Sequence, residues 1–125
     1  MLSKRILLVE DDFMNMRLAQ HILEAEGYTV LTAATAREAM EQIESSLPDL
    51  ILMDVQLPDM DGMMVVRILR GKATTKDITI LALTAYAMKE DRERILQMGC
   101  DGYISKPYDV QDFIDTVSRF LKSKS

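Results

Sequence analysis

Short apolar runs alternate five times with amphipathic stretches along this chain, and this alternation limits the possible folds more than any other feature. Two of the apolar runs, residues 6–9 and 50–53, are continuous and end directly in acidic residues. Continuous apolar runs are typical of strands that are buried on both faces, as in parallel sheets covered by helices. The pattern therefore predicts an α/β fold, a doubly wound parallel sheet of five strands flanked by five helices.

The expected elements follow from the spacing of apolar residues and from capping residues. Thr35 and Glu38 have the form of a capping box at the start of the second helix, and Asp109 is expected to cap the last helix. Strands are expected at residues 6–9, 29–32, 50–53, 78–83 and 102–105, and helices at 14–26, 36–43, 63–70, 88–98 and 110–121.

Length and composition are those of one globular domain. The chain has 125 residues, of which 48% are hydrophobic and 28% are charged, and no linker or repeat divides it. We therefore expect a single domain over residues 1–125, with a core over residues 4–121 and a polar C-terminal tail.

Charge and residue usage argue against several classes of function. A net charge of −5 disfavours contact with nucleic acid, because there is no basic surplus to bind phosphates. One cysteine and one histidine exclude a disulfide framework and a zinc site built on several cysteines. Because the sequence shows no signal peptide and no apolar run long enough to span a bilayer, we expect a cytoplasmic protein without a membrane partner.

Chemically active side chains follow four of the five predicted strands, at the edge where an open parallel sheet binds its ligands. Clustered carboxylates repel one another unless a cation lies between them, and hard oxygen ligands favour Mg²⁺, with Mn²⁺ also possible. A lysine and a threonine nearby would complete a site for a phosphoryl group, with an aspartate as the nucleophile. The residues are Glu10, Asp11 and Asp12 after the first strand, Asp54 after the third, Thr84 after the fourth and Lys106 after the fifth.

These residues stand within longer motifs that follow one another in order: residues 6–11, residues 48–58 followed by Asp61-Gly62, residues 83–85 and residues 103–107. With these motifs the chain resembles the receiver domains of response regulators, the phosphoacceptor half of bacterial two-component signalling, over residues 4–121. Within that family it is most similar to the stand-alone DivK-type cell-division regulators. The resemblance implies a flavodoxin-like sheet with the strand order 2-1-3-4-5.

The resemblance also implies a role for each residue of the site. Asp54 would accept the phosphoryl group, Thr84 would hydrogen-bond to it, and Lys106 would pair with one of its oxygens. Tyr103 would be an aromatic switch that moves with Thr84, and the peptide bond between Lys106 and Pro107 would be cis, as is usual in the family. Mg²⁺ would be held by Glu10 (mostly through water), Asp11, Asp54 and the backbone carbonyl of Gln56.

The same resemblance implies a signalling protein rather than an enzyme with a separate substrate. A histidine kinase or a histidine phosphotransferase, as in a phosphorelay, would supply the phosphoryl group. Phosphorylation would change the face formed by the fourth helix, fifth strand and fifth helix, where a downstream protein client would bind. Tyr86 is expected to slow the loss of phosphate, so Tyr86→Ala would shorten the lifetime of the phosphorylated protein.

Three other functions are compatible with parts of the pattern. A haloacid-dehalogenase-type phosphatase also uses an aspartate nucleophile with Mg²⁺, but it needs a second aspartate where this chain has Gln56. A flavin-binding electron carrier needs a phosphate-binding loop after the first strand, where this chain has three acids. A receiver that binds partners without phosphorylation would not need the complete set of site residues that is present.

Several residues have a structural as well as a functional interpretation. Asp12 is interpreted as the N-cap of the first helix or as an outer neighbour of the metal. Tyr103 is either a switch or a static, half-buried aromatic residue. Cys100 is expected to be packed and unreactive, and of the neighbours Met63 and Met64 only one is expected to point inward.

Overall fold

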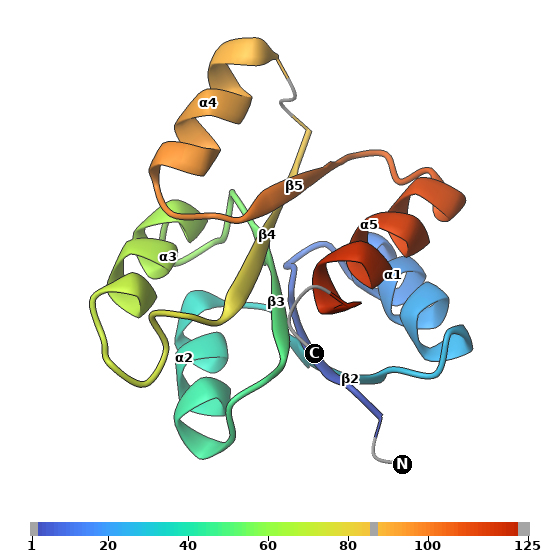
Figure 1. Ribbon diagram of the computed structural model, residues 1–125, viewed down its shortest axis with the longest axis horizontal. Helices are drawn as coiled ribbons and strands as arrows, with labels where there is room; N and C mark the ends of the chain where they lie inside the picture. Colours follow the sequence, from blue (N-terminus) through green and yellow to red (C-terminus); the bar gives the residue numbers. More distant parts are fainter. Residues whose placement is uncertain (1–2, 86–87, 123–125) are drawn as a thin grey trace.

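The computed structural model describes residues 3–85 and 88–122, in which five strands alternate with five helices (Figure 1). The strands are β1 (Arg5–Val9), β2 (Thr29–Ala33), β3 (Leu50–Asp54), β4 (Thr79–Thr84) and β5 (Gly102–Ser105). The helices are α1 (Phe13–Ala25), α2 (Ala36–Ser45), α3 (Gly62–Arg70), α4 (Lys89–Gln97) and α5 (Val110–Lys122). Every predicted element is present, with ends within one or two residues of those expected. None of the helices in these described ranges has the length and apolar character needed to cross a bilayer.

The five strands form one parallel sheet in the order β2-β1-β3-β4-β5, which confirms the predicted fold. The chain runs from β1 outward to β2 and then returns to the other side of β1 to form β3. Helices α1 and α5 cover one face of the sheet, and α2, α3 and α4 cover the other (Figure 1). This reversal of strand order between β1 and β3 is the point at which such sheets bind ligands, outside the carboxyl ends of the strands.

Each face of the sheet has its own hydrophobic core. Within β1, Ile6 and Leu8 belong to the core under α1 and α5, whereas Leu7 and Val9 belong to the core under α2, α3 and α4. All five residues of β3 are likewise buried. Burial on both faces explains why these strands are continuous apolar runs in the sequence.

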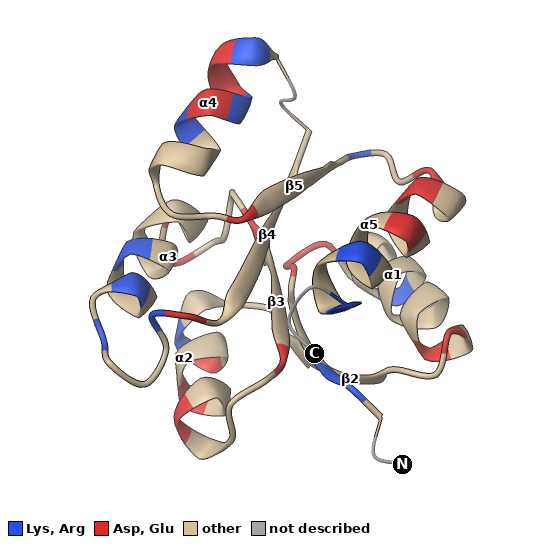
Figure 2. Cartoon of the chain, in the orientation of Figure 1, with Lys and Arg blue, Asp and Glu red and all other residues tan. Residues whose placement is uncertain are grey.

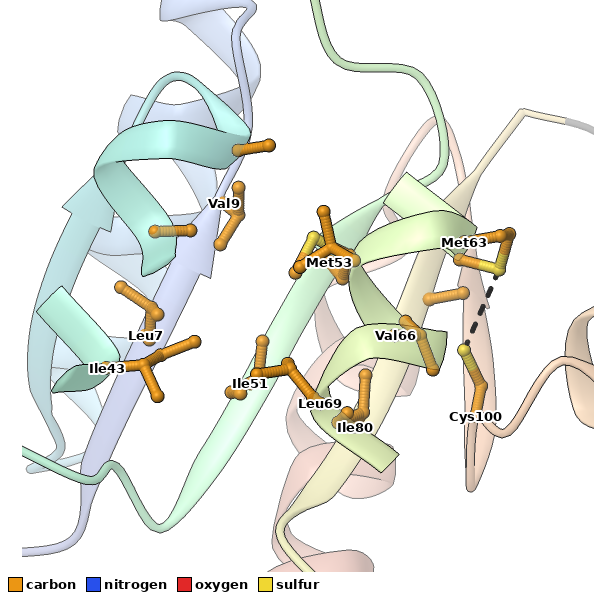
Figure 3. Close-up of a cluster of buried hydrophobic side chains, with 14 of the residues drawn as sticks. Leu7, Val9, Ile43, Ile51, Met53, Met63, Val66, Leu69, Ile80 and Cys100 are labelled. Carbon is orange, nitrogen blue, oxygen red and sulfur yellow. Dashed lines mark hydrogen bonds between the residues drawn. The ribbon is translucent and has the colours of Figure 1, made fainter. Parts of the chain in front are cut away.

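The core under α2, α3 and α4 contains the sulfur residues for which the sequence allowed more than one interpretation (Figure 3). Met63 is buried and its neighbour Met64 is exposed, as predicted. The Sγ of Cys100 lies 3.9 Å from the Sδ of Met63, and burial raises the pKa of the Cys100 thiol to about 12. A buried thiol with so high a pKa stays protonated at neutral pH, which agrees with a packing role.

Side chains cap the helices where the sequence indicated. Asp12 and Asp109 each accept a hydrogen bond at 2.9 Å from a backbone N–H in the first turn of α1 or α5. At the start of α2, the Oγ1 of Thr35 accepts from the N–H of Glu38 at 3.0 Å. The Glu38 carboxylate reaches back to the N–H of Ala34 rather than to that of Thr35, so the predicted capping box closes one residue earlier.

Helix α4 is attached to the body of the protein by much less apolar surface than α3. Both helices have nine residues, but α3 buries five of them and α4 buries only Ile95. Acidic and basic residues alternate along most of α4 (Figure 2), and its N-cap residue, Met88, makes no side-chain capping bond. Most of the charged residues of α4 therefore face solvent.

Arg70, at the end of α3, joins separate segments at the amino edge of the sheet. Its side chain forms an ion pair with Asp101 at 2.9 Å, and the same carboxylate oxygen accepts a hydrogen bond from the N–H of Ile80 in β4. The guanidinium also donates at 2.7–2.9 Å to three backbone carbonyl oxygens, those of Lys76, Ile78 and Gly99. These bonds fix the chain before β4 and before β5 against the end of α3.

Candidate functional site

The residues predicted to bind metal and phosphate come together at the carboxyl edge of the sheet. The ends of the strands and the turns that follow them line a groove of about 380 Å³. Figure 2 shows acidic residues in the turn after β1 and a basic residue in the turn after β5. The lining includes Glu10, Asp11, Asp54, Gln56, Thr84 and Lys106.

Three carboxylates lie close enough together to hold a metal ion. Oxygens of Glu10, Asp11 and Asp54 lie within 4.8 Å of one another. Glu10 and Asp54 are buried, and Asp11 is exposed. Carboxylates at this separation repel one another, and oxygen ligands of this kind favour Mg²⁺. The donor set therefore fits a small divalent cation.

Lys106 is the positive charge that faces these acids. Its Nζ lies 2.6 Å from the Oε1 of Glu10 and 3.0 Å from the Oδ2 of Asp54. Burial lowers the pKa of Lys106, but its hydrogen bonds and charge interactions with the two carboxylates outweigh burial, so the pKa is raised overall. Lys106 therefore stays charged, and one ammonium group is shared between two buried carboxylates.

The pKa of Glu10 reflects this imbalance. Burial raises the pKa of Glu10 most, Asp54 raises it further and Lys106 lowers it, with a result of about 7. The Oε1 of Glu10 is paired with the Lys106 ammonium at 2.6 Å, and this contact offsets the effect of burial only in part. At neutral pH a proton and a metal ion therefore compete for this carboxylate.

Asp54 is held at the end of β3 by backbone contacts. Its Oδ1 accepts a hydrogen bond from the N–H of Gln56 at 2.9 Å, and its Oδ2 pairs with Lys106. The start of α3 packs directly on Asp54, and a Cβ on Gly62 would collide with the Asp54 carbonyl oxygen. This close approach explains the Asp61-Gly62 pair, because Asp61 caps α3 and Gly62 allows the helix to begin here.

The loop after β3 is fixed by Asp59, a residue that sequence reasoning missed. Its carboxylate oxygens accept hydrogen bonds from the N–H groups of Ala36 and Arg37, at 2.9 and 3.1 Å. These bonds lower the pKa of Asp59, with the bond from Ala36 contributing most. The loop that carries Gln56 is thereby tied to the start of α2. No spacing in the sequence connects this loop with α2, so no local signal pointed to Asp59.

The two predicted switch residues lie on neighbouring strands. Thr84 ends β4, is buried and lines the groove. Tyr103 lies on β5, half-buried, and its hydroxyl accepts a hydrogen bond from the guanidinium of Arg92 in α4 at 3.2 Å. Tyr103 is therefore outside the acidic groove and attached to α4, and its role as a switch stays a prediction.

The remaining predictions for the site have different outcomes. The Lys106–Pro107 peptide bond is cis, as the resemblance implied. Asp12 is the N-cap of α1, and its N–H lies 3.4 Å from the Oε2 of Glu10, so it borders the acid cluster without joining it. Tyr86 and the tail residues 123–125 lie outside the described residues.

Tyr108 is the second residue near the site that sequence reasoning missed. It follows Pro107, and its ring packs edge-on against Phe113 of α5, with centroids 4.9 Å apart. Burial raises the pKa of Tyr108, and the charges of Glu10 and Asp54 raise it further. The tyrosine hydroxyl is therefore part of the surroundings of the acid cluster. Its place directly after the Lys-Pro pair was the available signal.

Comparisons with known proteins agree with this geometry. The family model described as "Response regulator receiver domain" matches residues 6–118. The polar-differentiation response regulator DivK of Brucella ovis is 42% identical over 120 residues, which cover 96% of this chain and 98% of that protein. A solved CheY-like response regulator receiver domain protein from Methanospirillum hungatei is 34% identical with a TM-score of 0.88, covering 98% of this chain and 96% of that chain.

A second solved structure bears on the metal. It is the receiver domain of a sensor histidine kinase from Pseudomonas aeruginosa, 34% identical with a TM-score of 0.88, and the match covers 97% of this chain and 99% of that chain. In that structure a magnesium ion is coordinated in the active-site cleft. Sheet order, acidic groove and sequence similarity agree, and the chain belongs to the response regulator receiver domain family.

Proposed function

We propose that this chain is a single-domain response regulator that accepts a phosphoryl group on Asp54 in a reaction that depends on Mg²⁺. The observation that carries this proposal is that Asp54 shares one groove with Glu10, Asp11 and Lys106. The DivK relatives have nearly the same length as this chain, which supports a single receiver domain over residues 1–125. Membership of the receiver family argues against the phosphatase and the flavin carrier.

The groove supplies the groups that phosphoryl transfer needs. An Asp54 carboxylate oxygen would attack phosphorus while the bond from phosphorus to a histidine nitrogen of the donor breaks, and that nitrogen would keep the electron pair. The Nζ of Lys106 lies 3.0 Å from the Asp54 carboxylate, where it can pair with an oxygen of the incoming group. Thr84, buried at the end of the neighbouring strand, brings a hydroxyl to the same groove.

The acid cluster supports a metal requirement. The residues that would hold Mg²⁺, or Mn²⁺ in its place, are Asp11, Asp54, the backbone carbonyl of Gln56 and, mostly through water, Glu10. When bound, the ion supplies positive charge beside the phosphoryl oxygens and offsets their repulsion by the acids. The N–H of Gln56 meanwhile keeps one Asp54 oxygen in place.

The response would reach its partners through the face of α4, β5 and α5. Arg92 of α4 donates a hydrogen bond to Tyr103 of β5, and Ile95 is the one buried residue of α4. A movement of Thr84 toward the phosphoryl group can therefore be passed to a face that shifts at little energetic cost. A histidine kinase or histidine phosphotransferase would donate the phosphoryl group, and a protein client would bind the changed face.

Mass spectrometry after incubation with acetyl phosphate and Mg²⁺ tests the proposal. We expect a phosphoryl adduct on the wild type and none on Asp54→Asn, because the amide is a poor nucleophile. Asp12→Asn is the matched control, since asparagine also caps helices and Asp12 lies outside the acid cluster. It should be modified like the wild type.

Chelation of Mg²⁺ before the reaction should abolish the adduct in both reactive proteins. A folded wild type that binds Mg²⁺ but shows no adduct, with the reaction sampled from seconds onward, would contradict the assignment. So would an Asp54→Asn variant that is modified to the same extent. In the proposed function the chain turns over no separate substrate and catalyses only its own phosphorylation and slow dephosphorylation.

A further inference from the structure

A second groove, the α2–α3 groove, opens between the ends of helices α2 and α3 (Figure 1). Its volume is about 340 Å³, and the apolar residues that line it are Met40, Ile43, Leu47 and Leu69. Leu47 is 49% exposed, and Met64 and Ile68, one turn apart on α3, are 46% and 36% exposed. Apolar side chains that gather beside a groove, rather than scattering singly, are typical of a surface that binds a partner.

One wall of the α2–α3 groove is already fixed by hydrogen bonds. The Oγ1 of buried Thr75 donates to the carbonyl oxygen of Leu69 at 2.6 Å. In the same turn, the N–H of Lys76 donates to the carbonyl oxygen of Lys72 at 2.9 Å. Because this wall is ordered before any partner binds, binding there carries a smaller entropic cost.

Opposite charges stand on the two walls of this groove. Glu44 belongs to the α2 wall and Lys72 to the α3 wall, and both residues are exposed. Neither side chain forms a hydrogen bond or an ion pair within residues 3–85 and 88–122. Each wall therefore offers one charge to a partner.

The sign of the charge continues along each helix (Figure 2). The one arginine of α2, Arg37, is paired with Glu41, so the helix keeps a surplus of negative charge. Residues 62–76, which include α3, contain no acidic residue, and their basic residues are Arg67, Arg70, Lys72 and Lys76. A complementary partner must therefore place basic groups against α2 and acidic groups against α3. A second copy of this chain, rotated by half a turn about an axis through the groove, meets both requirements.

We propose that the α2–α3 groove is the interface of a symmetric dimer, in which each copy of the chain binds the other. The same surface is used twice, so Glu44 of each copy would face Lys72 of the other, and Leu47 would cover the apolar lining of the opposite groove. Burial of these apolar side chains would supply the affinity. The exposed ion pairs would contribute little free energy and would fix the relative orientation of the two copies.

The position of the groove leaves the acid cluster accessible in both copies. The groove is lined by the last turn of α2 and by the residues that follow α3, and both segments lie toward the amino edge of the sheet. The acid cluster lies at the carboxyl edge. Association through this groove should therefore need neither Mg²⁺ nor a phosphoryl group.

Sedimentation equilibrium of the full chain, without Mg²⁺ or a phosphoryl donor, tests the proposal. Because the exposed apolar surface is small, we expect a weak dimer with a dissociation constant of about 10–100 µM. Leu47→Asp should weaken the association about tenfold or more, because it places a charge against the apolar lining. Circular dichroism and urea unfolding would establish that each variant is folded.

Reversal of the charges tests the orientation of the two copies. Lys72→Glu places like charges opposite each other twice in the dimer and should also weaken it about tenfold or more. Glu44→Lys combined with Lys72→Glu restores opposite charges at both places, so the double variant should associate like the wild type.

Leu18→Asp is the matched control, because Leu18 is 44% exposed and lies on α1, at the other face of the sheet. It should associate like the wild type. A wild type that stays monomeric up to about 300 µM would overturn the proposal, since a dimer of the expected strength would be populated there. So would a dimer that survives Leu47→Asp, a double variant that associates no better than Lys72→Glu, or a loss of association in Leu18→Asp. Asp54 takes no part in the test, so these outcomes leave the proposed function unchanged.

Discussion

The two edges of the sheet each place one positive charge among groups from distant parts of the chain, but with opposite results. At the amino edge all three guanidinium nitrogens of Arg70 donate, to carbonyl oxygens and to Asp101. At the carboxyl edge Lys106 is shared by two buried carboxylates, and the carboxylate of Asp11 adjoins them. The first edge is electrostatically balanced, and the second has a surplus of negative charge.

This difference separates the residues that stabilise the fold from those that we propose to bind the metal ion and the phosphoryl group. A balanced cluster gains nothing from a further ion, so its effect is confined to stability. A cluster with surplus negative charge is less stable alone and gains free energy when a cation enters. The two edges should therefore respond in opposite directions to mutation, to pH and to Mg²⁺.

The largest effect is expected from Arg70→Met at the amino edge. The substitution keeps much of the apolar stem but removes every guanidinium hydrogen bond and leaves Asp101 without its ion pair. We expect the free energy of unfolding, measured with urea, to fall by about 3 kcal/mol. Because the groove lies at the other edge, phosphorylation of the folded protein should remain.

Arg67→Met is the control for that variant, since Arg67 lies on the same helix with its side chain exposed. It should change the stability by less than about 0.5 kcal/mol. A similar loss of stability in both variants would show that the hydrogen bonds and ion pair of Arg70 stabilise the fold no more than the exposed side chain of Arg67 does.

A smaller effect is expected from pH at the carboxyl edge of the metal-free protein. Glu10, surrounded by Asp11, Asp54, Lys106 and Tyr108, has a pKa of about 7 against an ordinary value of 4.5. Between these values the folded state binds more protons than the unfolded state, so the stability falls as pH rises from 4.5 through 7. We expect the free energy of unfolding to fall by about 2 kcal/mol across this window. Urea unfolding at each pH would measure this change.

Two further measurements sharpen this expectation. Saturating Mg²⁺ should remove most of the loss, because the ion favours the ionised carboxylate. Glu10→Gln should lack the pH-dependent loss, since the amide does not titrate. An unchanged slope in that variant would assign the pH dependence to another group.

The smallest effect is a pair of identical substitutions with opposite signs. Asp54→Asn removes one negative charge from the crowded edge and can keep the hydrogen bond from the Gln56 N–H, so metal-free stability should rise by about 1 kcal/mol. Asp101→Asn removes the charge that faces Arg70 and should lower stability by about 1 kcal/mol. Shifts of the same sign in thermal unfolding would contradict the contrast between the edges.

The fold could be predicted because two of its central strands stand out in the sequence as continuous apolar runs. Residues 6–9 of β1 and 50–53 of β3 are buried on both faces of the sheet, so both runs are apolar without interruption, and both are followed by an acid. The ends of the elements were less certain, because capping depends on contacts that a local pattern shows only in part. Glu38, for example, bonds to Ala34 rather than to the expected Thr35.

The site was predictable where its chemistry follows strand ends and was missed where a contact joins distant segments. Glu10 and Lys106 come directly after a strand and Asp54 ends one, and parallel strands bring their carboxyl ends together. Asp59 accepts a hydrogen bond from the start of α2, and Tyr108 is affected by the charges of Glu10 and Asp54, and the local sequence indicates neither relation. Contacts of this kind depend on how helices and loops pack, which periodicity and motif spacing do not describe.

The weak burial of helix α4, which has one buried side chain, also affects how a partner protein would bind it. Few apolar contacts mean a low free energy of local opening, so its amide hydrogens should exchange with solvent long before those of α3. A segment that opens so readily samples several arrangements without global unfolding. The affinity of a partner protein that binds this helix is then multiplied by the fraction of molecules in the arrangement that can bind it. A small shift in that fraction, caused by a change at the groove, therefore produces a graded change in the amount of partner bound.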